Sequence, residues 1–183
     1  MNYTDLISSL LARLYKGNDQ LLATLLTHSE CVARKAVSIA DRNFPDADID
    51  FITEAAMLHD IGIIYCHAPA IGCHGDAPYI CHGIIGSEIL KAAGLPKHAL
   101  VCERHTGSGL TAEEVVEANL PLPVRDYLPL SLEEKLICYA DSFFSKSRDL
   151  RKEKSFDEVC LQMKAHGENP YQRFLELHNI LNP

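Results

Sequence analysis

The chain has 183 residues, of which 47% are hydrophobic and 23% charged, and its net charge is −8 at pH 7. These values are typical of one soluble globular domain with a full core, and no apolar run approaches the roughly 20 residues that span a bilayer. The acidic balance argues against binding to a nucleic-acid polymer, which needs a basic face.

The N-terminal segment has no basic leader before its apolar part, so we expect no signal peptide and a cytoplasmic protein. Seven cysteines are an odd number. In a cytosol we expect them to be reduced thiols, most of them buried as small hydrophobic side chains. The sequence leaves open whether the protein is a monomer or a homo-oligomer.

Apolar residues recur every three or four positions along most of the chain, which predicts helices. A short stripe over 6–14 precedes a long second helix from about Leu21 to Ile39. A third helix follows the break after residue 43 and ends near Gly62. The segment 65–79 is rich in Gly, Pro and His and has neither a helical nor a strand period, so we expect a loop or lid there.

The second half of the chain also predicts helices. Thr111 and Ser131 each stand three residues before a glutamate, the capping-box pattern of a helix start. The helices expected in this half cover 80–93, 96–105, a short segment from 111, 131 to about 146, and 156–178. No segment shows the clean alternation of a strand, so the predicted fold class is all-α.

The run "MLHDIGII" at 57–64 places His59 and Asp60 side by side in an apolar segment. A buried carboxylate needs a cationic partner or a metal ion, and otherwise it faces solvent. On this dipeptide alone, a satisfied core histidine beside a solvent-facing carboxylate at a helix end explains the pattern at least as well as a metal site.

Four further residues favour the metal site. His28, His82, His105 and Asp141 each fall on or at the end of an apolar helix face. Four histidines and two aspartates that point to one interior have no simple apolar explanation, and imidazoles with carboxylates suit zinc, iron, manganese and similar ions. Asp60 has two oxygens with which to bridge two ions about 3.5–4 Å apart, a pair that clamps a phosphoryl group.

The ordered set of His28, the His59–Asp60 pair and Asp141 resembles the signature of the HD-domain superfamily of metal-dependent phosphohydrolases. The letters "HDIG" resemble its HDIG subgroup, and His82 and His105 are similar to the extra histidines of members with two metal ions. The resemblance covers about 21–146. It implies one all-α domain over 1–183, a helical bundle with a central metal site and with the N- and C-terminal helices packed on it.

Carried over residue by residue, the resemblance assigns His28, His59, Asp60 and Asp141 to one ion. It assigns Asp60, His82 and His105 to a second. The implied cofactor is one or two divalent ions, with Fe, Mn, Zn, Co and Ni as candidates and Mg as a further one. The implied activity is cleavage of a phosphoester of a small metabolite or nucleotide through a metal-bound hydroxide, as a monoesterase or a diesterase.

The sequence also departs from this pattern. Ile63 stands where many HDIG phosphodiesterases have a lysine, and the GYP motif of the cyclic-dinucleotide branch is absent. The phosphate must then be bound by other groups. Lys146 and Arg104 are the best-placed cations unless they are surface charges, so Asp60, Lys146 and Arg104 are the candidate catalytic residues. Ser145 and Thr106 are weaker candidates for hydrogen bonds to phosphate.

Two other functions stay open at this stage. The same ligand set occurs in di-iron oxygenases of the HD type, and the fold could serve as a non-catalytic nucleotide-binding module.

The cysteines of "C66-H67…C73-H74…C81-H82" are too widely spaced for the usual zinc knuckle, so we favour a lid that places His67 or His74 near the substrate. Three further histidines are interpreted as surface or helix-end residues: His98, His166 and His178.

Overall fold

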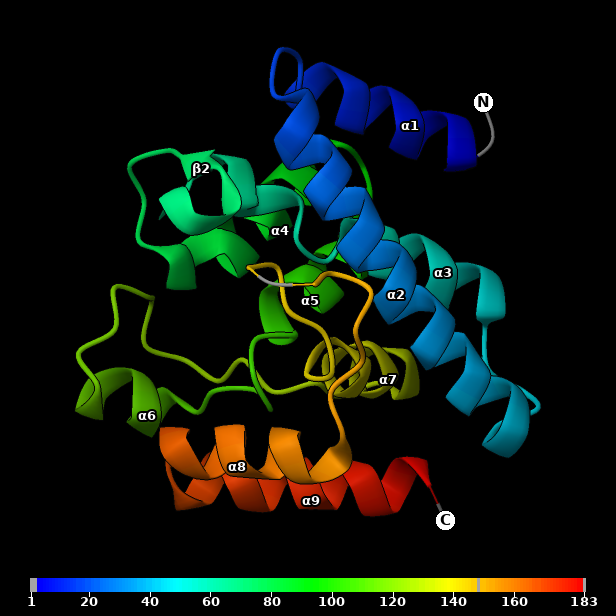
Figure 1. Cartoon of the computed structure of the whole chain (residues 1–183), viewed down its shortest axis with the longest axis vertical. Coiled ribbons are helices and arrows are strands. Elements are labelled where there is room, and N and C mark those ends of the chain that lie inside the picture. The colour runs from blue at the N-terminus through cyan, green and yellow to red at the C-terminus, as the bar shows by residue number, and fades with distance from the viewer. Residues whose placement is uncertain (1–2, 148, 183) are drawn as a thin grey trace.

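The computed structural model describes residues 3–147 and 149–182, and helices make up most of it (Figure 1). The all-α fold class is therefore confirmed. Within the described residues, no helix has both the length and the apolar character needed to cross a membrane. The α-helices are α1 (Tyr3–Leu14), α2 (Asp19–Asn43), α3 (Ile49–Leu58), α4 (His82–Ala92), α5 (Pro96–Arg104), α6 (Ala112–Glu117), α7 (Leu132–Asp141), α8 (Phe156–His166) and α9 (Glu168–Leu181).

Shorter elements connect α3 to α4. They are the 3-10 helices η1 (Ile61–Tyr65), η2 (Pro69–Ile71) and η3 (Tyr79–Cys81), and the strands β1 (His67–Ala68) and β2 (Cys73–His74). The strands pair antiparallel, with His67 opposite His74. The expectation of an irregular segment over 65–79 was wrong to this extent, because two-residue strands are too short to show a period.

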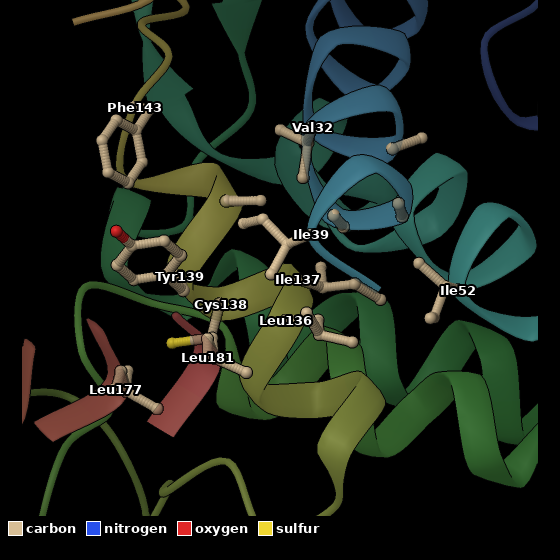
Figure 2. Close-up of a cluster of buried hydrophobic side chains, with 14 of the residues drawn as sticks. Val32, Ile39, Ile52, Leu136, Ile137, Cys138, Tyr139, Phe143, Leu177 and Leu181 are labelled. Carbon is tan, nitrogen blue, oxygen red and sulfur yellow. The ribbon is translucent and has the colours of Figure 1, made fainter. Parts of the chain in front are cut away.

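The long helix α2 runs through the molecule from α1 to the level of α7 (Figure 1). It contributes to two separate apolar clusters. The N-terminal cluster contains Leu10, Tyr15, Leu25, Leu58 and Leu90 among others, from α1, the first half of α2, α3, α4 and the adjoining loops. The C-terminal cluster contains Val32, Ile39, Ile52, Ile137 and Leu177 among others, from the second half of α2 and from α3, α7 and α9 (Figure 2).

The buried polar residues singled out in the sequence lie where the two apolar clusters meet. On α2, Leu25 belongs to the N-terminal cluster and Val32 to the C-terminal cluster, and His28 lies between them. At the end of α3, Leu58 is the last residue before His59. Hydrophobic burial on both sides therefore fixes the backbone on which the polar side chains stand.

Gly62 does not end α3, which stops at Leu58 with His59 as its C-cap. Gly62 lies in η1, where it allows η1 to approach α4. A Cβ atom at this position would collide with the carbonyl oxygen of His82 and would lie 2.6 Å from the nitrogen of Gly86. The absence of a side chain thus brings the backbone after Asp60 against the start of α4.

The last two predicted helices also end differently. Helix α7 stops at Asp141 and not near Lys146, because the chain then turns back and the Lys154 backbone N–H donates to the Phe143 carbonyl at 2.9 Å. The helix expected over 156–178 is two helices, α8 and α9. Gly167 separates them with a φ of +131°, a conformation that residues with a side chain rarely adopt.

Candidate metal centre

Five segments of the chain deliver the polar side chains to the border between the clusters. His28 comes from the middle of α2, His59 and Asp60 from the turn after α3, His82 from the first position of α4, His105 from the residue after α5, and Asp141 from the last position of α7. The structure brings all six together. Their ligand atoms form two groups, each within 4.8 Å: His28, His59, Asp60 and Asp141, and Asp60, His82 and His105.

Backbone carbonyls fix the orientation of three of the imidazoles. Nδ1 of His59 lies 2.6 Å from the Ala56 carbonyl oxygen, and Nδ1 of His82 lies 2.6 Å from that of Tyr79. Nδ1 of His105 lies 2.8 Å from the Cys102 carbonyl oxygen. A carbonyl only accepts, so each Nδ1 carries the proton. Each Nε2 therefore points into the cluster, which is the orientation of histidines that bind metal ions.

The inward-facing atoms fit a cation. Nε2 of His82 and Nε2 of His105 are 3.0 Å apart, a distance at which two lone pairs repel each other unless a proton or cation interacts with both. His59 Nε2 and Oδ1 of Asp60 are buried and have no hydrogen-bond partner among the described residues, whereas Oδ2 of Asp60 pairs with the Lys146 ammonium at 2.6 Å. Since leaving such groups unsatisfied is costly, the donor set matches divalent ions that accept nitrogen and oxygen ligands.

The carboxylates are ionised in this environment. Burial alone raises the pKa of Asp60, but the ammonium of Lys146 and the ring of His59 outweigh it and hold the pKa well below its usual range. Asp141 behaves in the same way, with Lys146 and His28 as its partners. Both carboxylates are therefore available as ligands at neutral pH.

The histidines differ in protonation. Burial lowers the pKa of His82 to about 4, since the attraction of Asp60 does not offset it. Burial and the charge of Lys146 also lower the pKa of His28. Burial alone lowers the pKa of His59 as well, yet Asp60 and Asp141 outweigh it and raise the pKa to about 10. Binding of a cation through His59 therefore displaces a proton at neutral pH.

Of the two cations proposed to bind phosphate, one reaches the cluster. Nζ of Lys146 lies 2.6 Å from Oδ2 of Asp60 and 3.8 Å from Oδ1 of Asp141. Arg104 does not reach it, because its guanidinium donates to the Glu134 carboxylate at 3.0 Å. Arg104 was selected for its position next to His105, but the turn of the helix directs its side chain to α7.

Comparison with known proteins agrees with this geometry. Residues 25–145 match the HD domain family. The chain belongs to the HD domain family. The match contains every residue of the cluster from His28 to Asp141 and leaves out α1, α8 and α9.

Three curated proteins are similar in sequence to this HD domain protein. An uncharacterised protein of Methanocaldococcus jannaschii is 36% identical over 169 residues, which are 90% of this chain and 89% of that protein. Two proteins named tRNA (cytidine(56)-2'-O)-methyltransferase, from Thermoplasma volcanium and Picrophilus torridus, are 30% and 33% identical over 86% and 79% of this chain. The chain spans 42% and 40% of the length of these two proteins. No solved structure matches the chain.

A cavity of about 880 Å³ adjoins the centre of this HD domain protein. Asp141 and Lys146 line it from the side of the cluster, and Lys152 and Lys154 add positive charge further out. Ser145 also lines it, whereas Thr106 lines a neighbouring hollow. We call this space the first cavity. Its size is in the range of small-molecule sites, about 300–1,000 Å³.

Tyr79 is a site residue that the sequence analysis missed. Its carbonyl orients His82, its ring stacks on the His82 ring with centroids 4.7 Å apart, and it lines the first cavity. The signal in the sequence was its position three residues before His82, the same separation that joins Ala56 to His59 and Cys102 to His105.

Two of the histidines interpreted as surface residues are partly or wholly covered. His98 is 5% exposed, and its Nε2 lies 3.3 Å from the Glu54 carboxylate. His178 accepts a hydrogen bond from the Tyr139 hydroxyl at 2.6 Å. His166 is exposed, as expected. The partners of His98 and His178 come from other helices, so the sequence around each histidine does not reveal them.

The histidines of the 65–79 segment do not line the first cavity, but His74 lines a further hollow together with Lys146. His67 and His74 pair across the two strands and are exposed. Cys66 and Cys73 are buried, and all the cysteines are free thiols. Among the described residues, the two groups that could hold a metal ion contain no cysteine, which gives no support to a structural zinc site in this segment.

Proposed function

We propose that this chain is a metal-dependent phosphohydrolase of the HDIG type that cleaves a phosphoester of a small molecule. The observation that carries the proposal is the position of Asp60. It belongs to both groups of ligand atoms, and Lys146 and the first cavity lie beside it. A carboxylate that belongs to two groups of ligand atoms, next to a cation and a cavity, suits phosphoryl transfer with divalent ions.

In this proposal the six residues of the cluster bind two divalent ions. His28, His59 and Asp141 would hold one ion with Asp60, and His82 and His105 would hold the second with Asp60. Candidate ions are Fe, Mn, Zn, Co or Ni, with Mg disfavoured by the number of nitrogen ligands. Bound divalent ions would supply Lewis-acid stabilisation of the phosphoryl oxygens and an activated water.

Lys146 has the clearest role among the groups that bind no ion. Burial alone lowers its pKa, but Asp141 and Asp60 outweigh it and raise the pKa above its usual value, so the ammonium stays charged. Its side chain lines the first cavity, where a phosphoryl group would reach both Lys146 and the ligands of the cluster. A fixed positive charge there stabilises negative charge that develops in the transition state.

We do not extend methyl transfer or tRNA binding to this chain. The two named methyltransferases are more than twice as long as the segment that matches, and this chain carries a net charge of −8. The substrate that we propose is a small molecule, and binding to a nucleic-acid polymer or to a membrane is not part of the proposal.

The experiment is hydrolysis of a phosphoester panel by purified protein that has been loaded in turn with Mn²⁺, Co²⁺, Fe²⁺, Zn²⁺, Ni²⁺ and Mg²⁺, with the metal content measured. We expect Asp60→Asn and His59→Ala to lose metal and at least 10³-fold in kcat/KM. The control Asp46→Asn removes an exposed carboxylate between α2 and α3 and should match the wild type. Full activity of Asp60→Asn, or oxygen consumption by the iron-loaded protein without phosphoester cleavage, would contradict the proposal.

A further inference from the structure

A second hollow of about 690 Å³ lies next to the first cavity. Tyr79, Gly107, Gln162 and Met163 line both spaces, so the two are neighbouring compartments. We call the second one the apolar groove, because its further lining includes Ile80, Leu110, Leu120 and Pro170. The groove is thus placed to receive another part of a molecule whose phosphoryl group occupies the first cavity.

The walls of the groove are held in place by hydrogen bonds. The hydroxyl of Ser108 donates to the Pro170 carbonyl at 2.8 Å. The guanidinium of Arg173 donates to the Gly109 carbonyl at 3.0 Å and to the Glu114 carboxylate at 2.8 Å. These bonds tie the loop after His105 to α9, so the groove exists before a ligand arrives and binding requires little ordering of the protein.

One wall of the groove lies outside the region shared with the HD domain family. Gln162, Met163 and Pro170 belong to α8 and α9, whereas the family match ends at residue 145. The metal centre lies inside the matched region, whereas this wall lies beyond it. The groove is therefore a place where this protein distinguishes its substrate from those of other HD domain proteins.

The charges of the two compartments differ. The first cavity is lined by three lysines, Lys146, Lys152 and Lys154, and by three carboxylates, Asp141, Asp149 and Glu158. The described lining of the groove has carboxylates but no lysine or arginine: Glu114, which pairs with Arg173, and the exposed Glu117 and Glu168. A phosphate therefore meets ammonium groups only in the first compartment, which favours an uncharged body in the groove.

We propose that the apolar groove binds a flat, uncharged ring of the substrate, a nucleobase or another aromatic group, while the ester phosphate binds at the metal centre. The inference rests on the proposed function. Tyr79 supports a flat ring, because it lines both compartments and its own ring is fixed by stacking on His82 at an interplanar angle of 26°. Sugar phosphates are poorer candidates because they leave the groove unfilled. Molecules with a second phosphate at the far end are poorer candidates because that phosphate would lie beside the carboxylates of the groove.

The test compares the four ribonucleoside 5′-monophosphates with ribose 5-phosphate, which carries a hydroxyl at C1 in place of the nucleobase. For at least one nucleotide we expect a wild-type kcat/KM at least tenfold above that for ribose 5-phosphate. Leu120→Trp, which fills the groove, should abolish this preference through a higher KM for the nucleotide, with ribose 5-phosphate changed less than twofold. Ile80→Trp serves as a second variant if the first does not fold.

Val116 lies in α6, four residues before Leu120, and is 60% exposed and outside the lining of the groove, so Val116→Trp is the matched control. It should keep the preference. Equal wild-type rates for both kinds of ester, or an equal loss of both in Leu120→Trp, would overturn the inference.

Failure of the proposed function gives a different result. If none of these esters is hydrolysed, calorimetry with the four unphosphorylated nucleosides still tests the groove. Binding to the wild type and to Val116→Trp that is lost in Leu120→Trp supports the inference, and no binding to the wild type overturns it.

Discussion

Nζ of Lys146 lies 2.6 Å from Oδ2 of Asp60, the carboxylate that both groups of ligand atoms share. The lysine reaches it from the loop between α7 and α8, five residues after Asp141. That loop is anchored at its base, because Nζ of Lys154 donates to the Ser142 carbonyl at 3.0 Å and Lys35 pairs with Glu153 at 2.6 Å. These contacts hold the loop in a position that keeps the buried ammonium of Lys146 beside the metal centre. The charge is therefore available to stabilise a bound phosphoryl group.

We expect Lys146→Met to lower kcat/KM for phosphoester hydrolysis by about 10²–10³-fold, the usual effect of removing one group that stabilises developing charge. The metal content should stay at the wild-type level, because lysine is not among the ligand atoms. Lys152→Met is the matched control, since Lys152 lines the same cavity but is exposed. A loss of activity in Lys152→Met equal to that in Lys146→Met would assign the effect to the general charge of the cavity.

A second prediction concerns the number of ions. If two ions bind, His28→Ala and His82→Ala should each lower the metal content from about two equivalents to about one, because each histidine belongs to only one group of ligand atoms. Asp60→Asn should remove both ions, since Asp60 belongs to both groups. The measurement is elemental analysis of the protein after dialysis against metal-free buffer. A wild type that holds one equivalent, with His82→Ala unchanged, would reduce the centre to a single ion.

The convergence of the six polar residues could be predicted from the sequence because each stands on or at the end of an apolar stripe. The spacing of Leu25, His28 and Val32 places a histidine on the buried face of α2, and the structure keeps it fully buried between the two clusters. Helical periodicity reports which face is buried, and a polar residue on that face must find a partner in the interior.

Features that depend on distant partners could not be predicted in this way. The direction of the Arg104 side chain follows from Glu134, which is 30 residues away, and the burial of His98 follows from Glu54 on another helix. The apolar groove is also a tertiary feature. It needs the loop after His105 to meet α8 and α9, and no local pattern records that contact.

The close approach of η1 to α4 predicts a large effect of Gly62→Ala. The added Cβ would collide with the backbone of His82 and Gly86, which has no flexible end that can move away. We expect a loss of about 3 kcal/mol or more in the free energy of unfolding, measured with urea. Gly17→Ala is the control, because Gly17 has a φ of +82° but open space around it. It should cost only about 1 kcal/mol of backbone strain.

The last prediction concerns a buried carboxylate away from the metal centre. The side chain of Glu103 is 2% exposed and is held by the guanidinium of Arg125 at 3.1 Å and 3.2 Å and by the Ser87 hydroxyl at 3.0 Å. Burial alone raises the pKa of Glu103, but Arg125 and Ser87 outweigh it and lower the pKa below its usual 4.5. The folded state thus stabilises the ionised form relative to the unfolded chain.

A lowered pKa contributes stability above the unfolded-state value of 4.5, and this contribution is lost as the pH falls through the folded-state pKa. We therefore expect Glu103→Gln to cost about 1–3 kcal/mol at pH 7 and clearly less at pH 3, as measured by urea unfolding. Glu88→Gln is the control, since the Glu88 side chain is 68% exposed on the same helix as Ser87 and its loss should stay within about 0.5 kcal/mol at both pH values. A cost for Glu103→Gln that is the same at pH 7 and pH 3 would show that its contribution does not depend on its charge.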